Sequence, residues 1–107
     1  MTTRTLQVLL ALVDGPSHGY GIRQTIRERT SGEVVLGSGT LYQAVDRLVG
    51  QGWIEEVAAP ADEPPSGGPR RRFYALTSLG RRELAAELER LNTVVEFARG
   101  RRLIEGG

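Results

Sequence analysis

The stretch that decides the fold is residues 38–57, SGTLYQAVDRLVGQGWIEEV, because its hydrophobic periodicity changes partway along. In the first part, three apolar side chains recur at helical spacing: Leu41, Val45 and Leu48. They predict a helix from Thr40 to about Gln51, with Ser38 as its N-cap and Gly52 as a left-handed C-terminal cap. The next residues, Trp53–Val57, are rich in aromatic and β-branched side chains, which favour a strand.

A matching strand and a final helix follow downstream. Arg72–Leu76 has the same aromatic and β-branched character as Trp53–Val57, so the two segments are expected to pair as a hairpin. The connection between them, Ala58–Pro69, holds four prolines and two glycines. Neither flank could bury a core alone, so we interpret this connection as the hairpin tip and not as a domain linker. A helix is then expected from Thr77 or Ser78 to about Arg99.

Two helices are expected before residue 38. The first covers the apolar run Leu6–Val13, which suits a helix packed on two sides. The second begins with Ser17 as its N-cap and runs to about Thr30, and Val34–Leu36 has the composition of a short strand. The predicted order is helix, helix, short strand, helix, strand, loop, strand, helix. This α+β arrangement, mainly α with a small β-hairpin, is typical of a winged helix-turn-helix.

The chain has the length of one domain, 107 residues. We expect residues 1–77 to form the winged helix-turn-helix, with a wing loop at about 58–70. Residues 78–99 should form a C-terminal dimerisation helix, and residues 100–107 a flexible tail. No apolar run reaches the ~18 residues needed to span a bilayer, and no secretory signal is evident. A soluble, cytoplasmic protein without membrane contact is therefore expected.

Composition excludes several kinds of chemistry. The chain has no cysteine and a single histidine, so it offers no disulfide, no thiolate metal site and no histidine metal cluster. No nucleophile, base and orienting group occur together, and His18 lies in a helix-opening turn where capping or packing accounts for it. We therefore expect no enzyme, no catalytic or metal-binding residue and no cofactor.

Net charge by itself gives little support to nucleic-acid binding. It is only +1, from 14 basic and 13 acidic residues. All the basic residues are arginines, whose planar guanidinium suits phosphate and guanine, although a GC-rich genome produces the same bias. The position of the charges therefore matters more than their number.

The outward face of the helix expected at Thr40–Gln51 holds the candidate base-reading residues. With the apolar side chains inward, the outward set is Thr40, Gln43, Asp46, Arg47 and Gly50, of which Thr40, Gln43 and Arg47 are the candidates. A winged helix-turn-helix places this helix in the major groove, where a hydroxyl, an amide and a guanidinium can bond to base edges; a solvated surface carries the same residue types. Asp46 repels phosphate, and in a groove it can accept from cytosine or hold an arginine in place; we interpret it as orienting.

Further residues are expected at the DNA backbone. Tyr42 lies at the edge of the outward face, where it either packs half-buried or reaches a phosphate with its hydroxyl. Three adjacent arginines stand at the base of the wing: Arg70, Arg71 and Arg72. They cannot all find carboxylate partners, so they are candidates for phosphate or minor-groove contact, with a solvated charge run as the alternative. Tyr20 and Ser38, near the starts of the second and third helices, complete the set.

The last helix carries a heptad seam formed by Leu84, Leu88, Leu91, Val95 and Ala98. Its first turn should cover the domain's own core. Little of the domain remains beyond about Leu91, so Leu88, Leu91 and Val95 are expected to face a second copy of the chain. A dimer would place two recognition helices about 34 Å apart, the spacing that a palindromic DNA site requires.

The chain resembles the PadR-like transcriptional regulators of bacteria in four blocks that occur in order. They are Gly15-Pro16-Ser17-His18-Gly19-Tyr20, Gly39-Thr40-Leu41-Tyr42, Leu48 through Gly52-Trp53-Ile54, and Arg71-Arg72-Phe73-Tyr74-Ala75-Leu76-Thr77 leading to Gly80-Arg81. The resemblance implies a dimeric repressor that leaves double-stranded operator DNA in response to a small-molecule effector or another cue. The short C-terminal part is similar to that of the smaller members, in which the first helix completes the dimer. This adds Leu6, Leu9 and Leu10 to the expected dimerisation residues.

The chain departs from the family pattern at one base-reading position. Members commonly have proline directly after Thr-Leu-Tyr, whereas this chain has Gln43, so the operator cannot be carried over from the family. Phe97, the one aromatic residue of the last helix, is expected to pack, and no effector site is assigned. Because net charge is near zero, a winged helix that binds a protein partner and no DNA is the alternative function.

Overall fold

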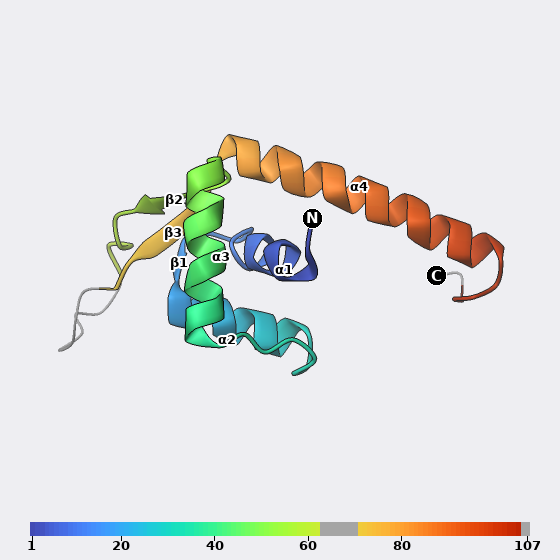
Figure 1. Ribbon diagram of the computed structural model, residues 1–107, viewed down its shortest axis with the longest axis horizontal. Helices are drawn as coiled ribbons and strands as arrows, with labels where there is room; N and C mark the ends of the chain where they lie inside the picture. Colours follow the sequence, from blue (N-terminus) through green and yellow to red (C-terminus); the bar gives the residue numbers. More distant parts are fainter. Residues whose placement is uncertain (63–70, 106–107) are drawn as a thin grey trace.

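The computed structural model describes residues 1–62 and 71–105 of the chain, which form four helices and a small sheet (Figure 1). In chain order these are α1 (Thr3–Ala11), β1 (Ser17–His18), α2 (Gly19–Arg29), α3 (Ser38–Gln51), β2 (Ile54–Val57), β3 (Phe73–Leu76) and α4 (Ser78–Gly100). The predicted α+β fold, mainly helical with a small β-hairpin and a single C-terminal helix, is confirmed. In the described part of the chain, no helix is long and apolar enough to cross a membrane.

The sheet has three antiparallel strands in the order β1-β3-β2. The hairpin of β2 and β3 was predicted, and Ile54 pairs with Leu76 at its inner end. The third strand was expected at Val34–Leu36, but that segment is not a strand, and β1 at Ser17–His18 takes the place beside β3. At residues 34–36 the backbone bonds to side chains instead, because the carbonyl oxygen of Leu36 accepts from Nε of Arg23 at 2.8 Å.

The core lies where α1, α2 and α3 meet the sheet. Its fully buried side chains are Val8, Leu9, Leu12, Ile22, Ile26, Leu41, Val45, Leu48 and Ile54. Within α2 and α3 these side chains recur three or four residues apart, so each of the two helices turns one apolar stripe inward, while α1 buries the neighbours Val8 and Leu9. From α4, only Leu84 joins this core.

The N-terminal caps of α2 and α3 differ from those predicted, whereas the C-terminal cap of α3 is the predicted one. His18, not Ser17, caps α2, because its Nδ1 accepts from the backbone N–H of Gly21 at 3.0 Å while Ser17 is paired in β1. Ser38 is the first residue of α3, and Gly37 before it provides no side-chain cap, so the expected cap by Ser38 is wrong. Gly52 does adopt the left-handed conformation predicted for it, with φ 76°.

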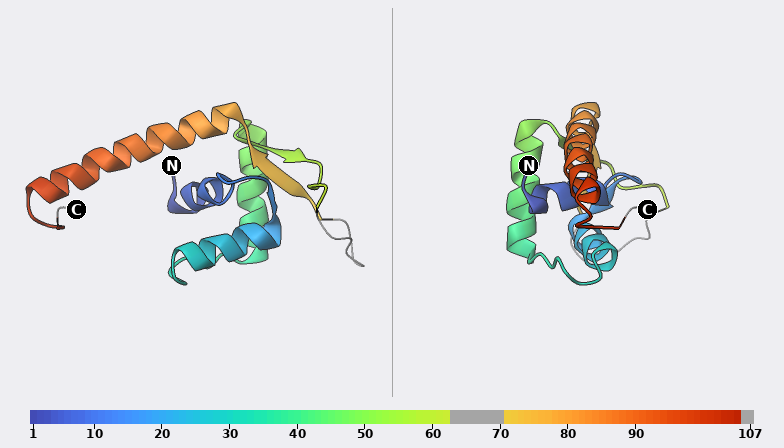
Figure 2. Two further views of the ribbon diagram at one scale, coloured as in Figure 1. Left: turned by 180° about the vertical axis from the view of Figure 1, so that it is seen from behind. Right: turned by 90° about the vertical axis from the view of Figure 1, so that its right-hand side faces the viewer.

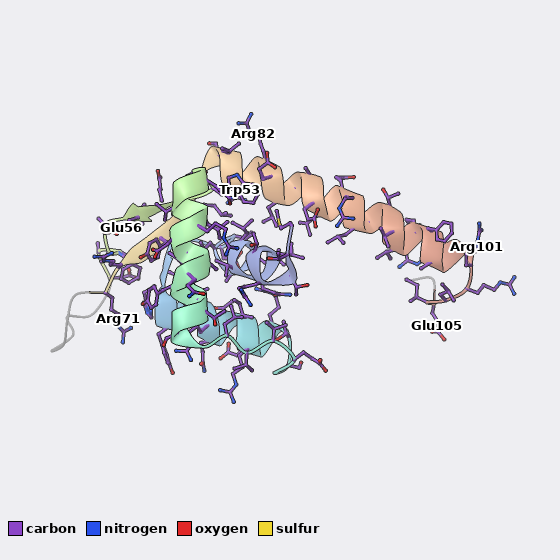
Figure 3. The ribbon with its side chains drawn as sticks, in the orientation of Figure 1. Trp53, Glu56, Arg71, Arg82, Arg101 and Glu105 are labelled. Carbon is purple, nitrogen blue, oxygen red and sulfur yellow. The ribbon has the colours of Figure 1, made fainter. Side chains whose placement is uncertain are left out.

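A tight junction joins the end of α3 to the start of α4. The Thr77 hydroxyl donates to the carbonyl oxygen of Gly52 at 2.6 Å and also accepts from the backbone N–H of Gly80 at 3.0 Å. The backbone N–H of Thr77 donates to the carbonyl oxygen of Trp53 at 3.1 Å. A Cβ at Gly80 would lie 1.9 Å from that same oxygen, so only glycine permits this approach. Figure 3 shows Trp53 between the end of α3 and the start of α4.

The wing and α4 leave this body in opposite directions. In Figures 1 and 2, the β2–β3 hairpin extends to one side of α3, and α4 extends far past α1 on the other side. With 23 residues, α4 is about 34 Å long. Its C-terminal half has no other helix of the chain beside it in either figure. The fold therefore separates one end of the molecule, with α3 and the wing, from the other, with α4.

Candidate nucleic-acid interface

Helix α3 has one buried and one exposed face. The buried face consists of Leu41, Ala44, Val45 and Leu48. The opposite face carries the predicted base-reading residues: Gln43 and Arg47 are exposed, and Thr40 is half-buried. Among the described residues, neither Gln43 nor Arg47 has a hydrogen-bonding or charged partner. Both side chains are thus available for an external ligand.

Two glycines leave parts of the exposed face of α3 without side chains. A Cβ added at Gly39 or at Gly50 would meet nothing within 4 Å. Glycine in a helix costs about 1 kcal/mol relative to alanine, and packing within this chain does not require it at either position. The helix backbone is therefore more accessible at Gly39 and Gly50 than where larger side chains project.

Asp46 lies on the same exposed face but does not hold an arginine. Within residues 1–62 and 71–105, its carboxylate forms no hydrogen bond and no ion pair, even with Arg47 directly after it in the sequence. The interpretation of Asp46 as an orienting residue is therefore wrong for the described part of the chain. Its carboxylate is exposed and, among the residues that the structure describes, unpaired.

Beside α3, an open hollow of about 520 Å³ lies between the start of α2, α3 and the root of the wing. Its lining consists of His18, Gly19, Tyr20, Tyr42, Asp46, Arg71, Arg72 and Tyr74. Four predicted backbone-contacting residues thus meet in one place, since Tyr20, Tyr42, Arg71 and Arg72 are all among them. Figure 3 shows Arg71 at the root of the wing, projecting away from the sheet toward the start of α2.

His18 connects the parts of this hollow. Besides capping α2 with Nδ1, it places Nε2 2.9 Å from Nη1 of Arg71. The ring packs edge-on against Phe73 at 5.2 Å between centroids, and it stacks with Tyr20 at 6.4 Å. The predicted capping and packing role is confirmed, but the sequence did not show that His18 also contacts the wing.

Tyr42 rests against the backbone of α2. A Cβ at Gly19 would lie 2.5 Å from the Tyr42 hydroxyl oxygen, so the absence of a side chain at Gly19 makes room for this ring. Tyr42 is nevertheless 45% exposed. One part of the ring therefore packs against α2, and the rest is accessible from the hollow; contact of the hydroxyl with a phosphate stays a prediction.

Tyr74 was missed as a site residue because it lies in a strand and contributes to the core. It is 4% exposed, and burial raises the pKa of its phenol, while a hydrogen bond with Arg72 opposes that rise. The phenol therefore remains neutral near pH 7 and positions the Arg72 guanidinium at the edge of the hollow. Spacing could have indicated this, since Arg72 and Tyr74 are two residues apart, and side chains at this spacing project from the same face of an extended chain.

The remaining expected backbone contacts lie at two places. Ser38 is exposed at the start of α3. Arg70 and most of the expected wing loop, residues 63–70, lie outside the described residues. Chemically, the site combines guanidinium, phenol and amide donors with one carboxylate, a set that suits anionic and hydrogen-bonding ligands. In residues 1–62 and 71–105, no three acidic or histidine side chains are grouped so that they could hold a metal ion.

The expected dimerisation residues fall into two groups. Leu88 and Val95 on α4 are exposed, and Leu91, Leu6 and Leu10 are half-buried, so all five have surface to offer a partner. By contrast, Leu9 is fully buried in the core of the single chain and has no surface to offer a partner. The prediction that Leu9 contacts a second copy is therefore wrong.

The C-terminal end of α4 differs from the prediction at Phe97 and in the segment after the helix. Phe97 is 62% exposed and is covered by the guanidinium of Arg101, 4.6 Å from its ring centre, so it does not pack into the core as expected. The segment expected to be a flexible tail begins with an ordered turn, in which the backbone N–H of Leu103 donates to the carbonyl oxygen of Ala98 at 3.0 Å. Figure 1 shows the chain turning back after α4, and Figure 3 shows Arg101 and Glu105 at this end.

Sequence comparison relates the chain to one family. A sequence model of the Transcriptional regulator PadR-like family matches residues 8–86. An uncharacterised 37.1 kDa protein in transposon TN4556 of Streptomyces fradiae is 41% identical over 80 residues, which are 75% of this chain and 20% of that protein. The chain thus spans about a fifth of that relative. Uncharacterised protein X of Lysinibacillus sphaericus is 29% identical over 93 residues, 84% of this chain and 82% of the relative.

Solved structures share the fold. A PadR family transcription regulator from Clostridium difficile superposes with a TM-score of 0.76 at 24% identity, over 92% of this chain and 97% of that one. A transcriptional regulator from Clostridium thermocellum gives 0.73 at 26% identity, over 91% and 87%. Bacillus subtilis PadR, solved in complex with operator DNA, gives 0.69 at 22% identity, over 82% of this chain and 48% of that one. The winged-helix fold is therefore shared with these proteins.

Proposed function

The chain belongs to the PadR-like family of transcriptional regulators, and we propose that it is a dimeric repressor that binds a palindromic operator in double-stranded DNA. Release by a small-molecule effector or another cue is part of the same proposal. Since the family is one of regulators, the prediction that the chain is not an enzyme is confirmed. The alternative of a winged helix that binds a protein and no DNA is an outcome of the tests below.

The exposed face of α3 is the observation that carries the proposal. Gln43 and Arg47 lie one turn apart on it, and both are exposed and without a partner in the described chain. Gly39 and Gly50 carry no side chains that would cover the helix backbone near them. An α-helix fits the major groove, where an arginine side chain can form two hydrogen bonds to a guanine and a glutamine side chain two to an adenine. Thr40 is half-buried at the first turn and is the third proposed base contact. Bacillus subtilis PadR, which has the same fold, was solved in complex with operator DNA.

The hollow beside α3 supports contact with the DNA backbone. It brings the phenols of Tyr20 and Tyr42 together with the guanidinium groups of Arg71 and Arg72. These are the donor types that proteins direct at phosphate oxygens. Because they come from α2, α3 and the wing, one bound strand would orient all three elements at once. Ser38 and, outside the described residues, Arg70 extend the proposed contacts.

The long helix α4 supports dimerisation. Leu88, Leu91 and Val95 form a seam on it with surface left uncovered by the chain, and Leu6 and Leu10 on α1 lie half-buried. Apolar seams of this kind are covered most economically by a second copy around a two-fold axis. Residues 1–77 are thus the proposed DNA-binding unit and residues 78–99 the proposed dimerisation helix.

The experiment is a binding titration with operator DNA obtained by selection from a random duplex library. Replacing both Gln43 and Arg47 with alanine should weaken operator binding. The expected loss is about 1 to 3 kcal/mol for each bidentate side-chain contact to a base that is removed. Binding to an unrelated duplex should fall much less, because the bonds to phosphates remain.

A matched control is Arg82→Ala, which removes the same charge as Arg47→Ala. Figure 3 shows Arg82 pointing outward from the first turns of α4, away from α3. If the Gln43/Arg47 double variant binds its operator as tightly as the control does, α3 is not the reading helix. If the unaltered protein binds no duplex at any salt concentration, the protein-partner alternative replaces the proposal.

A further inference from the structure

Asp46 is the one acidic residue on the exposed face of α3 that is also part of the hollow. It lies one helical turn after Tyr42 and next to Arg47, so it occupies the centre of the proposed DNA-binding surface. A carboxylate there repels every phosphate that approaches. Since the proposed partner is a polyanion, the position of Asp46 needs an explanation of its own.

Holding an arginine does not explain this position. Arg71 and Arg72 line the same hollow, but Arg71 contacts His18 and Arg72 bonds to Tyr74. In the described part of the chain, Asp46 has no hydrogen bond and no ion pair with either. Stabilising α3 does not explain it either, because Asp46 lies two turns beyond the first residues of the helix, where a carboxylate interacts little with the helix dipole.

The surroundings of Asp46 leave room for a base. A Cβ at Gly50, one turn after Asp46 on the same face, would meet nothing within 4 Å, and the same holds for Gly39, two turns before it. The carboxylate is therefore not screened by bulky neighbours along the helix. In the major groove, only the exocyclic amino groups of cytosine and adenine donate hydrogen bonds, and cytosine is the usual partner of an acidic side chain.

We infer that Asp46 is a specificity-determining residue that accepts a hydrogen bond from the amino group of a cytosine in each half of the operator. The inference rests on the proposed function. Asp46 then acts in two ways. It lowers the affinity for DNA in general by repelling phosphates, and it recovers affinity only where a cytosine amino group meets the carboxylate. Specificity obtained by penalising wrong partners is a known device at interfaces.

The test compares the unaltered protein with Asp46→Asn in selection from a random duplex library. The amide removes the charge while keeping the size of the side chain, and its neutral oxygen accepts a hydrogen bond more weakly than the carboxylate does. Glu89→Gln is the matched control, because it makes the same change at an exposed position of α4 whose carboxylate has no partner in the described chain. Thermal unfolding followed by circular dichroism checks that both variants are folded.

For Asp46→Asn we expect affinity for an unrelated duplex to rise about threefold, and discrimination in favour of cytosine at one position of each half-site to fall about tenfold. Replacing that cytosine with 2-pyrimidinone, which lacks the amino group, should weaken binding of the unaltered protein about tenfold and weaken binding of Asp46→Asn less. Glu89→Gln should behave as the unaltered protein in all three measurements.

The outcomes separate the inference from the proposal on which it rests. An enriched operator with the same base preferences for Asp46→Asn and Glu89→Gln overturns the inference and leaves the proposed function standing. A rise in general affinity with unchanged preference for cytosine overturns it as well. If selection with the unaltered protein enriches no sequence, the proposed function fails, and the inference fails with it.

Discussion

Gly80 shows how one residue can fix the relation between two helices. The carbonyl oxygen of Trp53, at the end of α3, lies where a side chain of residue 80 would begin, 1.9 Å from an added Cβ. The same oxygen accepts from the backbone N–H of Thr77. A larger residue at position 80 must therefore push α4 away and break this bond.

We predict that Gly80→Ala lowers the free energy of unfolding by about 3 kcal/mol, since overpacking against backbone cannot be relieved by a rotamer change. The melting temperature should fall by about 10 °C or more. Gly50→Ala is the matched control, because its Cβ meets nothing within 4 Å and alanine favours a helix. If calorimetry finds the two variants equally stable, α4 is not held tightly at Gly80.

Single residues also mark the limit of prediction from sequence. The outward positions of Gln43 and Arg47 followed from helical periodicity alone, and both are exposed in the structure. By contrast, the contact of His18 with Arg71 joins residues 53 positions apart, and no local pattern encodes it. Leu9 was assigned to a partner because the resemblance implies that the first helix completes the dimer, and only the packed structure shows that its side chain is fully buried.

At the scale of elements, periodicity predicted the four helices and the β2–β3 hairpin. It failed for β1, because a strand of two residues has no periodicity, and its existence depends on β3, more than 50 residues away. Val34–Leu36 had the better strand composition, but no neighbouring strand pairs with it. Strand formation requires a partner, and composition alone does not provide one.

The seam of α4 leads to a prediction about oligomeric state. Leu91→Asp should convert the dimer to a monomer in sedimentation-velocity measurements, because a carboxylate buried at an apolar interface costs several kcal/mol. Leu91 is half-buried and contributes little to the core of the chain, so the variant should remain folded.

Thr93→Asp is the control for this variant. At 100° per residue, position 93 lies on the side of α4 opposite the seam, and Thr93 is exposed. The control should sediment as the unaltered protein does. Should Leu91→Asp also remain dimeric, the seam is not the dimer interface, and another surface must join the two copies.

At the scale of the whole molecule, the fold places two surfaces of different composition at opposite ends. The wing, α3 and the start of α2 form a surface rich in arginine and tyrosine, and α4 extends away from it with an uncovered apolar seam (Figures 1 and 2). The junction at Thr77 and Gly80 connects the two ends. Under the proposed function, this junction offers a route by which an effector that shifts α4 would act on operator binding.

The central claim, a dimer that reads a DNA sequence through α3, is tested most directly by measuring affinity for a selected palindrome and for an unrelated duplex of equal length at two salt concentrations. We predict two chains bound per palindrome, at least about 10³-fold preference over the unrelated duplex, and affinities that fall steeply as salt rises. Equal affinity for the two duplexes, or affinities that do not respond to salt, would contradict the account.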